Sequence, residues 1–262
     1  MPELPEVNTV QKMLQEEAVG HRIHRVEVWD DHILRNLGGD EFSSRLERRM
    51  VEGTYRRGKY LFARLDQDDY VLLHLGMTGD LRYYNDPLER SRYERFNWQL
   101  SNGRYIGFDD PRKFGRIHYI EDLDRFIQEV GLGPDALDIT LDDWMKKMEG
   151  RNTPIKSWLM DQSLLAGIGN LYADEICYQC RVHPASKTGS IPAKKQQEMH
   201  RKMREILTLA CERDAYYKVY PEDWFWKWRE PGAQNPNGPG AAESMKIGGR
   251  TTYFVEGWQV RY

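Results

Sequence analysis

The sequence contains few cysteines. Three cysteines in 262 residues are too few for a disulfide framework. Cys177 and Cys180 form a CxxC pair, but no second pair of ligands follows, and Cys211 stands alone. Ordinary buried thiols are therefore favoured over a redox or metal-binding role.

Long apolar segments are also absent. No apolar run approaches the roughly 18–20 residues of a membrane-spanning helix. The first twenty residues mix polar and charged groups with apolar ones, which is not the pattern of a signal peptide. We therefore expect neither a signal peptide nor a membrane anchor, and a cytoplasmic location.

The sequence has no overall positive charge. Its net charge of −3 and pI of about 6.2 argue mildly against a nucleic-acid partner. However, residues 45–59 and 194–204 each carry a net charge of +4, whereas residues 121–143 carry −7. Because a polyanion responds to the local field, DNA and RNA are not excluded.

The length suits two modest domains. Residues 5–18 place Val7, Val10, Leu14 and Ala18 at helical spacing, and short alternating runs from about 21 to 120 predict a β-sandwich. After an acidic, turn-rich connection at 131–143, helical patterns dominate, the first capped by Thr153 with Pro154 at the first helical position. A Gly/Pro-rich loop at 231–244, expected to be mobile, precedes a predicted hairpin with Glu256-Gly257 at its turn.

The N-terminus, MPELPEV, is either an ordinary chain end, which is favoured when the segment is taken alone, or the first sign of chemistry. Removal of Met1 would leave Pro2 with a secondary amine, and an α-amino group has a reference pKa of roughly 7.7–8. Such an amine can attack a sugar C1′ and form an iminium. Glu3 is placed to move protons to the sugar or the leaving base.

Two loops carry the second sign. GMTGDLR places Met77 at a glycine-flanked turn, and DDPRKFGR places Arg112 and Phe114 on one side of an extended segment. These side chains suit the gap left when a base is extruded from a duplex. The alternative is that Met77 and Phe114 are core residues and Arg112 a solvated charge.

A glycine-rich helix start carries the third sign of chemistry. In AGIGNLYADE, residues 166–175, the glycines allow close approach to backbone amides, and Asn170 can cap the following helix. Free N–H groups at such a start bind phosphate, and Lys156 can add a charge.

Together these segments resemble the formamidopyrimidine-DNA glycosylase/endonuclease VIII family of bifunctional DNA repair enzymes. The resemblance spans nearly the whole chain in family order. It rests on MPELPEV, GKYL at 58–61, HLGMTG at 74–79, DPRKFGR at 110–116, LGP at 132–134, AGIGNLYADE, HP at 183–184 and GGRTTYF at 248–254.

The resemblance implies a role for each matching residue. Pro2 would be the nucleophile, Glu3 the acid/base, Glu6 a supporting acidic residue, and Lys59 a catalytic phosphate ligand. Those implied to contact DNA are His74, Met77, Arg112, Phe114, Lys156, Asn170 and Arg250. Among them, Arg112 would face the orphaned base and Arg250 would lie at the tip of a finger hairpin.

Two segments depart from the family pattern. Members commonly end in a four-cysteine zinc finger, but no cysteine follows Cys211. The hairpin is therefore expected to hold by packing, without zinc, as in the zincless-finger branch. The other departure is 214–230, where a Gly/Thr-rich loop that closes over the base is usual. Here the alternation around Trp224, Trp226 and Trp228 predicts a strand, with core packing favoured over base stacking.

We therefore predict an α+β fold: an N-terminal β-sandwich with flanking helices, then a helix–two-turn–helix domain ending in a zincless hairpin. The expected boundaries are 1–130, a linker at 131–145, 146–230, and 231–262 for the loop and finger. The resemblance implies a DNA glycosylase/AP lyase of base excision repair, acting as a monomer on double-stranded DNA with damaged bases or abasic sites and without cofactor. The alternatives are a DNA-binding paralogue without activity and, more remotely, an RNA-binding protein.

Overall fold

The apolar spacing near the N-terminus forms helix α1 (Leu4–Ala18) in the computed structural model, which describes residues 1–262. Val7, Val10, Leu14 and Ala18 are all buried, as predicted. The chain divides into two compact units. The first comprises Met1–Pro2 and Glu6–Gly131, and the second comprises Glu3–Pro5 and Leu132–Tyr262.

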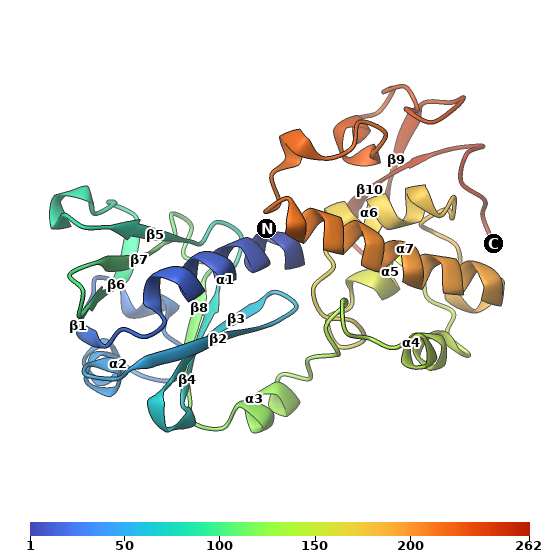
Figure 1. Ribbon diagram of the computed structural model, residues 1–262. Helices are drawn as coiled ribbons and strands as arrows, with labels where there is room; N and C mark the ends of the chain where they lie inside the picture. Colours follow the sequence, from blue (N-terminus) through green and yellow to red (C-terminus); the bar gives the residue numbers. More distant parts are fainter. The chain divides into compact units, whose positions relative to one another are not determined.

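The first unit contains two four-stranded antiparallel sheets (Figure 1), which confirms the predicted sandwich. One sheet has the order β1 (Ile23–Val28), β6 (Glu94–Leu100), β7 (Tyr105–Asp109), β5 (Asp80–Tyr84). The other has the order β2 (Val51–Arg57), β3 (Tyr60–Leu65), β4 (Tyr70–His74), β8 (Arg116–Ile120). Phe96 and Trp98 from the first sheet share a buried cluster with Leu61 and Leu73 from the second and with the apolar face of α1.

Two short helices flank the sandwich at positions that the sequence did not locate. Helix α2 (Gly39–Leu46) and helix α3 (Leu123–Glu129) are eight and seven residues long, which is too short for a clear helical period. The side chain of Asp122 caps α3 by accepting a hydrogen bond from the Arg125 N–H at 2.9 Å. The acidic segment 121–143 thus includes a helix cap, Asp122.

The second unit is mainly helical. Its helices are α4 (Leu141–Met148), α5 (Ile155–Met160), α6 (Asn170–Gln179) and α7 (Ala193–Glu212). They enclose a core in which Trp144 and Trp158 meet edge to face, with ring centroids 4.7 Å apart. The three cysteines are buried in α6, at its C-terminal end and in α7, as predicted, and burial raises the pKa of the Cys180 thiol to about 12.

The hairpin of the second unit turns at a different place from the one expected. Strands β9 (Ala242–Ile247) and β10 (Arg250–Val255) are joined by Gly248 and Gly249, with φ of 56° and 75°. Two residues of positive φ form the tight turn that suits a hairpin. The prediction of a turn at Glu256-Gly257 was wrong, since that pair follows β10.

Two further local expectations were wrong. Residues Phe225–Trp228 form a 3-10 turn and not a strand, although Trp224 and Phe225 are buried, as the core interpretation predicted. Helix α5 begins at Ile155 with Pro154 in the N-cap position, and no side chain caps it. A proline there fixes the entry angle without a capping hydroxyl.

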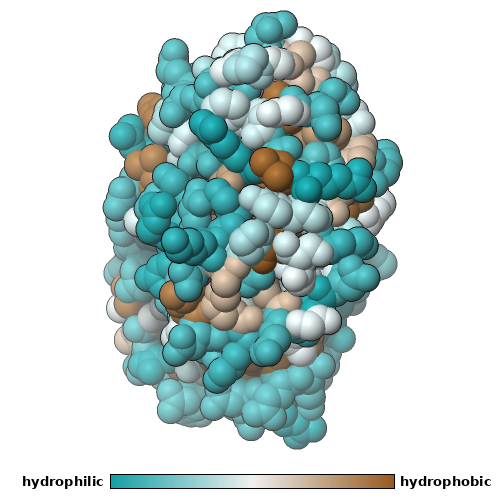
Figure 2. Space-filling view, turned by 90° about the vertical axis from the view of Figure 1, so that its right-hand side faces the viewer, coloured by the Kyte–Doolittle hydropathy of each residue, from teal (hydrophilic) through white to brown (hydrophobic).

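Hydrophilic side chains cover most of the face shown in Figure 2, and the hydrophobic ones form small separate spots. No helix has the length and apolar character required to cross a bilayer.

Candidate active site and nucleic-acid interface

The N-terminal end of the chain is held by helix α6. The Leu4 N–H donates to the Gly167 carbonyl at 3.0 Å. The buried Glu3 carboxylate accepts hydrogen bonds from three backbone N–H groups, those of Gly169 at 2.7 Å, Leu171 at 2.8 Å and Tyr172 at 3.3 Å. Glu3 therefore caps α6 from a position 166 residues earlier in the chain.

This arrangement corrects two expectations for AGIGNLYADE. The N-cap position belongs to Gly169, and Asn170 is the first helical residue, with no capping hydrogen bond. Three of the N–H groups expected to bind phosphate, those of Gly169, Leu171 and Tyr172, are instead taken by Glu3. A helix N-terminus stabilises a carboxylate as readily as a phosphate, because its free N–H groups donate hydrogen bonds and the helix dipole places partial positive charge there.

Gly169 is required by the position of Glu3. A Cβ at Gly169 would lie 2.4 Å from the carboxylate carbon of Glu3. The glycine therefore leaves room for the carboxylate, which is joined to Pro2 by one peptide bond. Pro2 itself is half-buried, whereas Met1 is exposed.

The predicted duplex-entering residues are exposed. Met77 is 43% and Phe114 46% exposed, so the alternative that they belong to the core is wrong. The guanidinium of Arg112 lies over the Phe114 ring, 4.8 Å from its centroid. The loop 110–115 thus presents a cation and an aromatic ring together.

The two loops that carry these residues are fastened to each other. Fully buried Asp110 accepts hydrogen bonds from the Thr78 hydroxyl at 2.7 Å and from the Gly115 N–H at 2.7 Å. Gly76 has a φ of 61°, and a Cβ there would lie 2.4 Å from the Phe114 carbonyl. The loops therefore form one platform that presents Met77, Arg112 and Phe114.

His74 ends β4 in the second sheet of this unit, and Lys59 lies in the turn between β2 and β3 of the same sheet. Burial, Arg116 and Lys59 lower the pKa of His74 to about 4. His74 Nδ1 accepts the Gly76 N–H at 3.1 Å, so the neutral ring carries its proton on Nε2 and can donate it. Lys59 is 6% exposed and follows Gly58, which has a φ of 60°. Glu6 is half-buried in α1.

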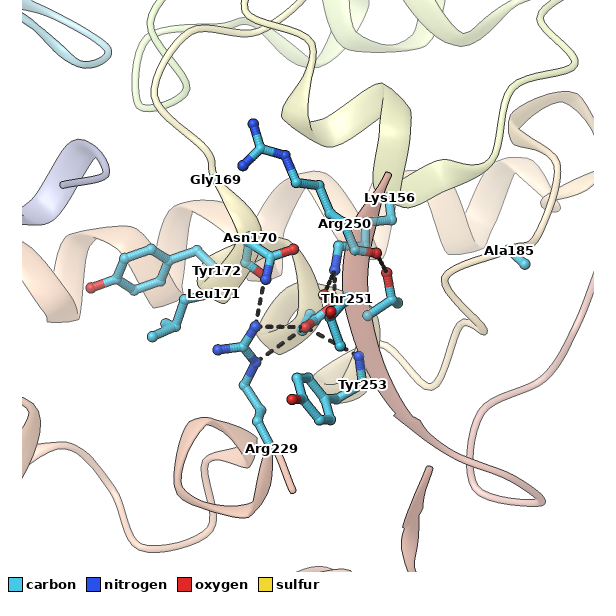
Figure 3. A network of polar contacts seen from close by, with 12 residues as sticks. Lys156, Gly169, Asn170, Leu171, Tyr172, Ala185, Arg229, Arg250, Thr251 and Tyr253 are labelled. Carbon is cyan, nitrogen blue, oxygen red and sulfur yellow. Dashed lines mark hydrogen bonds and ion pairs between the residues drawn. The ribbon is translucent and has the colours of Figure 1, made fainter. Parts of the chain in front are cut away.

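Lys156 lies in the interior, not at the surface. Its side chain is fully buried, and its Nζ pairs with Asp174 of α6 at 2.7 Å and donates to the Thr251 carbonyl of β10 at 3.2 Å (Figure 3). Burial lowers the pKa of Lys156, and the ion pair opposes that shift. The expected direct contact of Lys156 with a DNA phosphate does not fit this placement, because the ammonium has no exposed surface.

Arg250 is exposed at the first residue of β10, next to the two-glycine turn. Figure 3 shows its side chain extended, with no hydrogen bond or ion pair to the other residues drawn. Asn170 is half-buried in the first turn of α6, and its carbonyl accepts a hydrogen bond from Arg229 at 3.4 Å.

Comparison with known proteins bears on both units. Residues 1–117 match the Formamidopyrimidine-DNA glycosylase N-terminal domain, and residues 130–219 match the Formamidopyrimidine-DNA glycosylase H2TH domain. The formamidopyrimidine-DNA glycosylase of Chloroflexus aurantiacus is 31% identical over 272 residues, which cover 99% of this chain and 98% of that protein. The chain belongs to the formamidopyrimidine-DNA glycosylase family.

Other members of the family agree. The Acidiphilium cryptum enzyme of the same name is 40% identical over 197 residues, which cover 73% of this chain and 70% of that protein. A crystal structure of Lactococcus lactis formamidopyrimidine-DNA glycosylase, non-covalently bound to DNA that contains an AP site, has a TM-score of 0.90 at 26% identity. It covers 98% of this chain and 99% of that one. The predicted fold, a sandwich followed by a helix–two-turn–helix domain, is therefore that of the family.

The hairpin of this family member contains neither cysteine nor histidine, and the structure holds no cluster of His, Cys, Asp and Glu suited to a metal ion. Phe254 of β10 meets His183 edge to face at 4.5 Å. Ala242 of β9 and Val255 of β10 share a buried cluster with Tyr178 and Phe225, whose rings stack at 4.4 Å. The Gln259 side chain accepts the Val255 N–H at 2.8 Å.

Glu175 fixes the aromatic turn that follows α7, a role that the sequence did not indicate. This fully buried carboxylate on α6 accepts the N–H groups of Phe225 at 3.2 Å and Trp226 at 3.0 Å. Burial raises the pKa of Glu175 to about 7. In this family member, 225–228 is therefore a packed turn held by a carboxylate. The only sequence feature that pointed to a role for Glu175 was its position at the end of the AGIGNLYADE segment.

Proposed function

We propose that this protein is a bifunctional DNA glycosylase and AP lyase of base excision repair that uses Pro2 as its nucleophile. The observation that carries the proposal is the fixed Glu3 carboxylate, which is held by three N–H groups of the α6 start and joined to Pro2 by one peptide bond. Membership of the glycosylase family and the likeness to an enzyme bound to AP-site DNA support it.

The reaction begins when removal of Met1 frees the Pro2 amine. The amine attacks C1′ of the damaged nucleotide, the N–C1′ bond forms, and the glycosidic bond breaks as the base leaves with a proton. The C1′–O4′ bond then breaks, O4′ takes a proton, and the nitrogen lone pair forms the iminium at C1′. Loss of a C2′ proton expels the 3′ phosphate, and loss of a C4′ proton then expels the 5′ phosphate. Glu3 moves protons between the sugar and the leaving groups, because its carboxylate is already oriented by α6.

The exposed platform of the first unit supports the opening of the duplex. Met77 and Phe114 would fill the space left by the extruded nucleotide, and Arg112 would face the orphaned base. His74 would donate its Nε2 proton to a phosphate oxygen as a neutral ring, and Lys59 would hold a phosphate near the lesion. Glu6 would support these groups from α1.

In the second unit, Asn170 and Arg250 would contact the DNA backbone. The favoured substrates are DNA duplexes with oxidised bases or abasic sites, since a damaged pair is less costly to open than a normal one. A packed aromatic turn at 225–228 stands in place of the Gly/Thr-rich loop that usually closes over the base, so the base preference of family members with that loop does not transfer to this chain. No step of this reaction requires a metal ion or organic cofactor. An enzyme with this substrate acts in the cytoplasm, at the nucleoid in a bacterium.

Borohydride trapping tests the proposal. Met-trimmed protein incubated with duplex DNA that contains an abasic site should form a covalent adduct in the presence of borohydride. Pro2→Gly should abolish or strongly reduce the adduct, and Glu3→Gln should impair release of a damaged base. DNA binding without any adduct would instead indicate a lesion-binding protein without lyase activity.

A further inference from the structure

A buried charge network joins two helices of the second unit to the hairpin. Lys156 of α5 and Arg229 share the carboxylate of Asp174 of α6, with Nζ at 2.7 Å from one oxygen and the guanidinium at 2.9 Å from the other. Lys156 and Asp174 are fully buried. Each cation also donates to a carbonyl, Lys156 to Thr251 and Arg229 to Asn170, so the excess positive charge is stabilised.

Three contacts connect this network to β10. Lys156 Nζ donates to the Thr251 carbonyl at 3.2 Å, and the Tyr253 N–H donates to Asp174 at 3.3 Å. The Arg229 guanidinium lies 5.2 Å from the centroid of the Tyr253 ring (Figure 3). The network therefore binds the backbone of β10 at alternate residues.

The hairpin tip also meets α5. A Cβ at Gly248 would lie 3.2 Å from the hydroxyl oxygen of Ser157, the residue after Lys156. Arg250 therefore lies between two contacts with α5, one at Gly248 and one at Thr251. Its own side chain is exposed, and Figure 3 shows no ion pair between it and the other residues drawn.

We propose that Lys156 and Asp174 are positioning residues that set the place and direction of Arg250 on the DNA backbone. This rests on the proposed function. Lys156 acts through the Thr251 carbonyl and does not itself touch the DNA. In a hairpin without cysteine or histidine, the ion network supplies a fixed point close to the tip.

Salt dependence of binding distinguishes positioning from direct contact. Each lost phosphate contact lowers the slope of log K against log salt by about 0.9. The probe is a duplex that contains a tetrahydrofuran abasic analogue, and the proteins are wild type, Arg250→Ala, Lys156→Met and the double variant. We expect each single variant to lower the slope by about 0.9 and the double variant to lower it by no more than either single one.

A drop of about 1.8 in the double variant would mean that Lys156 contacts its own phosphate, and it would overturn the proposal. So would an unchanged slope in Lys156→Met. Lys146 is an exposed residue of α4; Lys146→Met removes the same charge and should leave the slope unchanged.

If Lys156→Met fails to fold, Lys156→Met combined with Asp174→Asn removes both charges together and should show the same slope as Arg250→Ala. A wild type that does not prefer the abasic duplex would overturn the proposed function itself, whereas additive losses in a wild type that binds would overturn the positioning role alone.

Discussion

The Glu3 carboxylate occupies the space in which a side chain at position 169 would lie. Its Oε2 accepts the Gly169 N–H at 2.7 Å, and its carboxylate carbon lies 2.4 Å from the position of a Cβ on Gly169. A glycine in the second unit therefore determines where the acidic residue beside the proposed nucleophile can be.

Gly169→Ala should reduce base release more than it reduces stability. The new methyl group must displace the Glu3 carboxylate, and a shift of about 1 Å at a catalytic group costs on the order of 100-fold in rate. Single-turnover excision from a duplex with an oxidised base measures the effect. The matched control is Gly53→Ala, at a strand position where a Cβ meets nothing within 4 Å. Equal rates for the two variants would contradict the proposed role of Glu3.

Gly76→Ala should loosen the platform of Met77 and Phe114. The substitution combines a positive φ with a clash against the Phe114 carbonyl, and we expect a loss of about 3 kcal/mol of stability. Gly103→Ala, where φ is 85° but space is open, should cost only about 1 kcal/mol. Chemical denaturation compares them, and similar losses would show that the close approach of the two loops contributes little.

Glu175→Gln should change how stability depends on pH. The folded protein retains the Glu175 proton up to about pH 7, whereas the ordinary pKa of a glutamate is 4.5. Because the pKa is raised in the folded state, the protonated carboxyl contributes fully to the free energy of unfolding below pH 4.5. This contribution is lost as the pH rises to 7. The Gln variant lacks this loss, so its free energy of unfolding relative to wild type should improve by about 3 kcal/mol over that range. Denaturation curves at several pH values measure the trend, and a constant difference would contradict the raised pKa.

His74→Asn should act in the opposite direction. The folded ring has a pKa of about 4, against an ordinary histidine pKa of 6.5. Between these values the unfolded chain binds a proton that the folded protein does not. The wild type should therefore lose about 2–3 kcal/mol relative to the variant as the pH falls from 6.5 to 4. If the wild type lost no stability relative to the variant on acidification, His74 would not be neutral in the folded state.

The sequence predicted the features that depend on local spacing. Helix α1 could be predicted from the helical spacing of Val7, Val10, Leu14 and Ala18. The exposure of Met77 could be predicted from its position in a glycine-flanked loop. Contacts between distant residues could not be predicted this way. The Glu3 cap on α6 links residues 166 positions apart, and no local pattern encodes it.

Two sequence patterns were ambiguous for physical reasons. The alternating residues at 224–228 have the period of a strand, but Glu175 binds consecutive N–H groups there and holds a tight turn. Lys156 looks like a surface charge in a helix start, but its partner Asp174 lies on another helix, so its burial could not be read from the sequence.

Mass spectrometry of the borohydride-trapped complex tests the central claim most directly. After trapping on abasic-site DNA and digestion, the adduct should map to the N-terminal peptide, on Pro2 of protein that has lost Met1. An adduct on a lysine, or none from Met-trimmed protein that binds the duplex, would contradict the account.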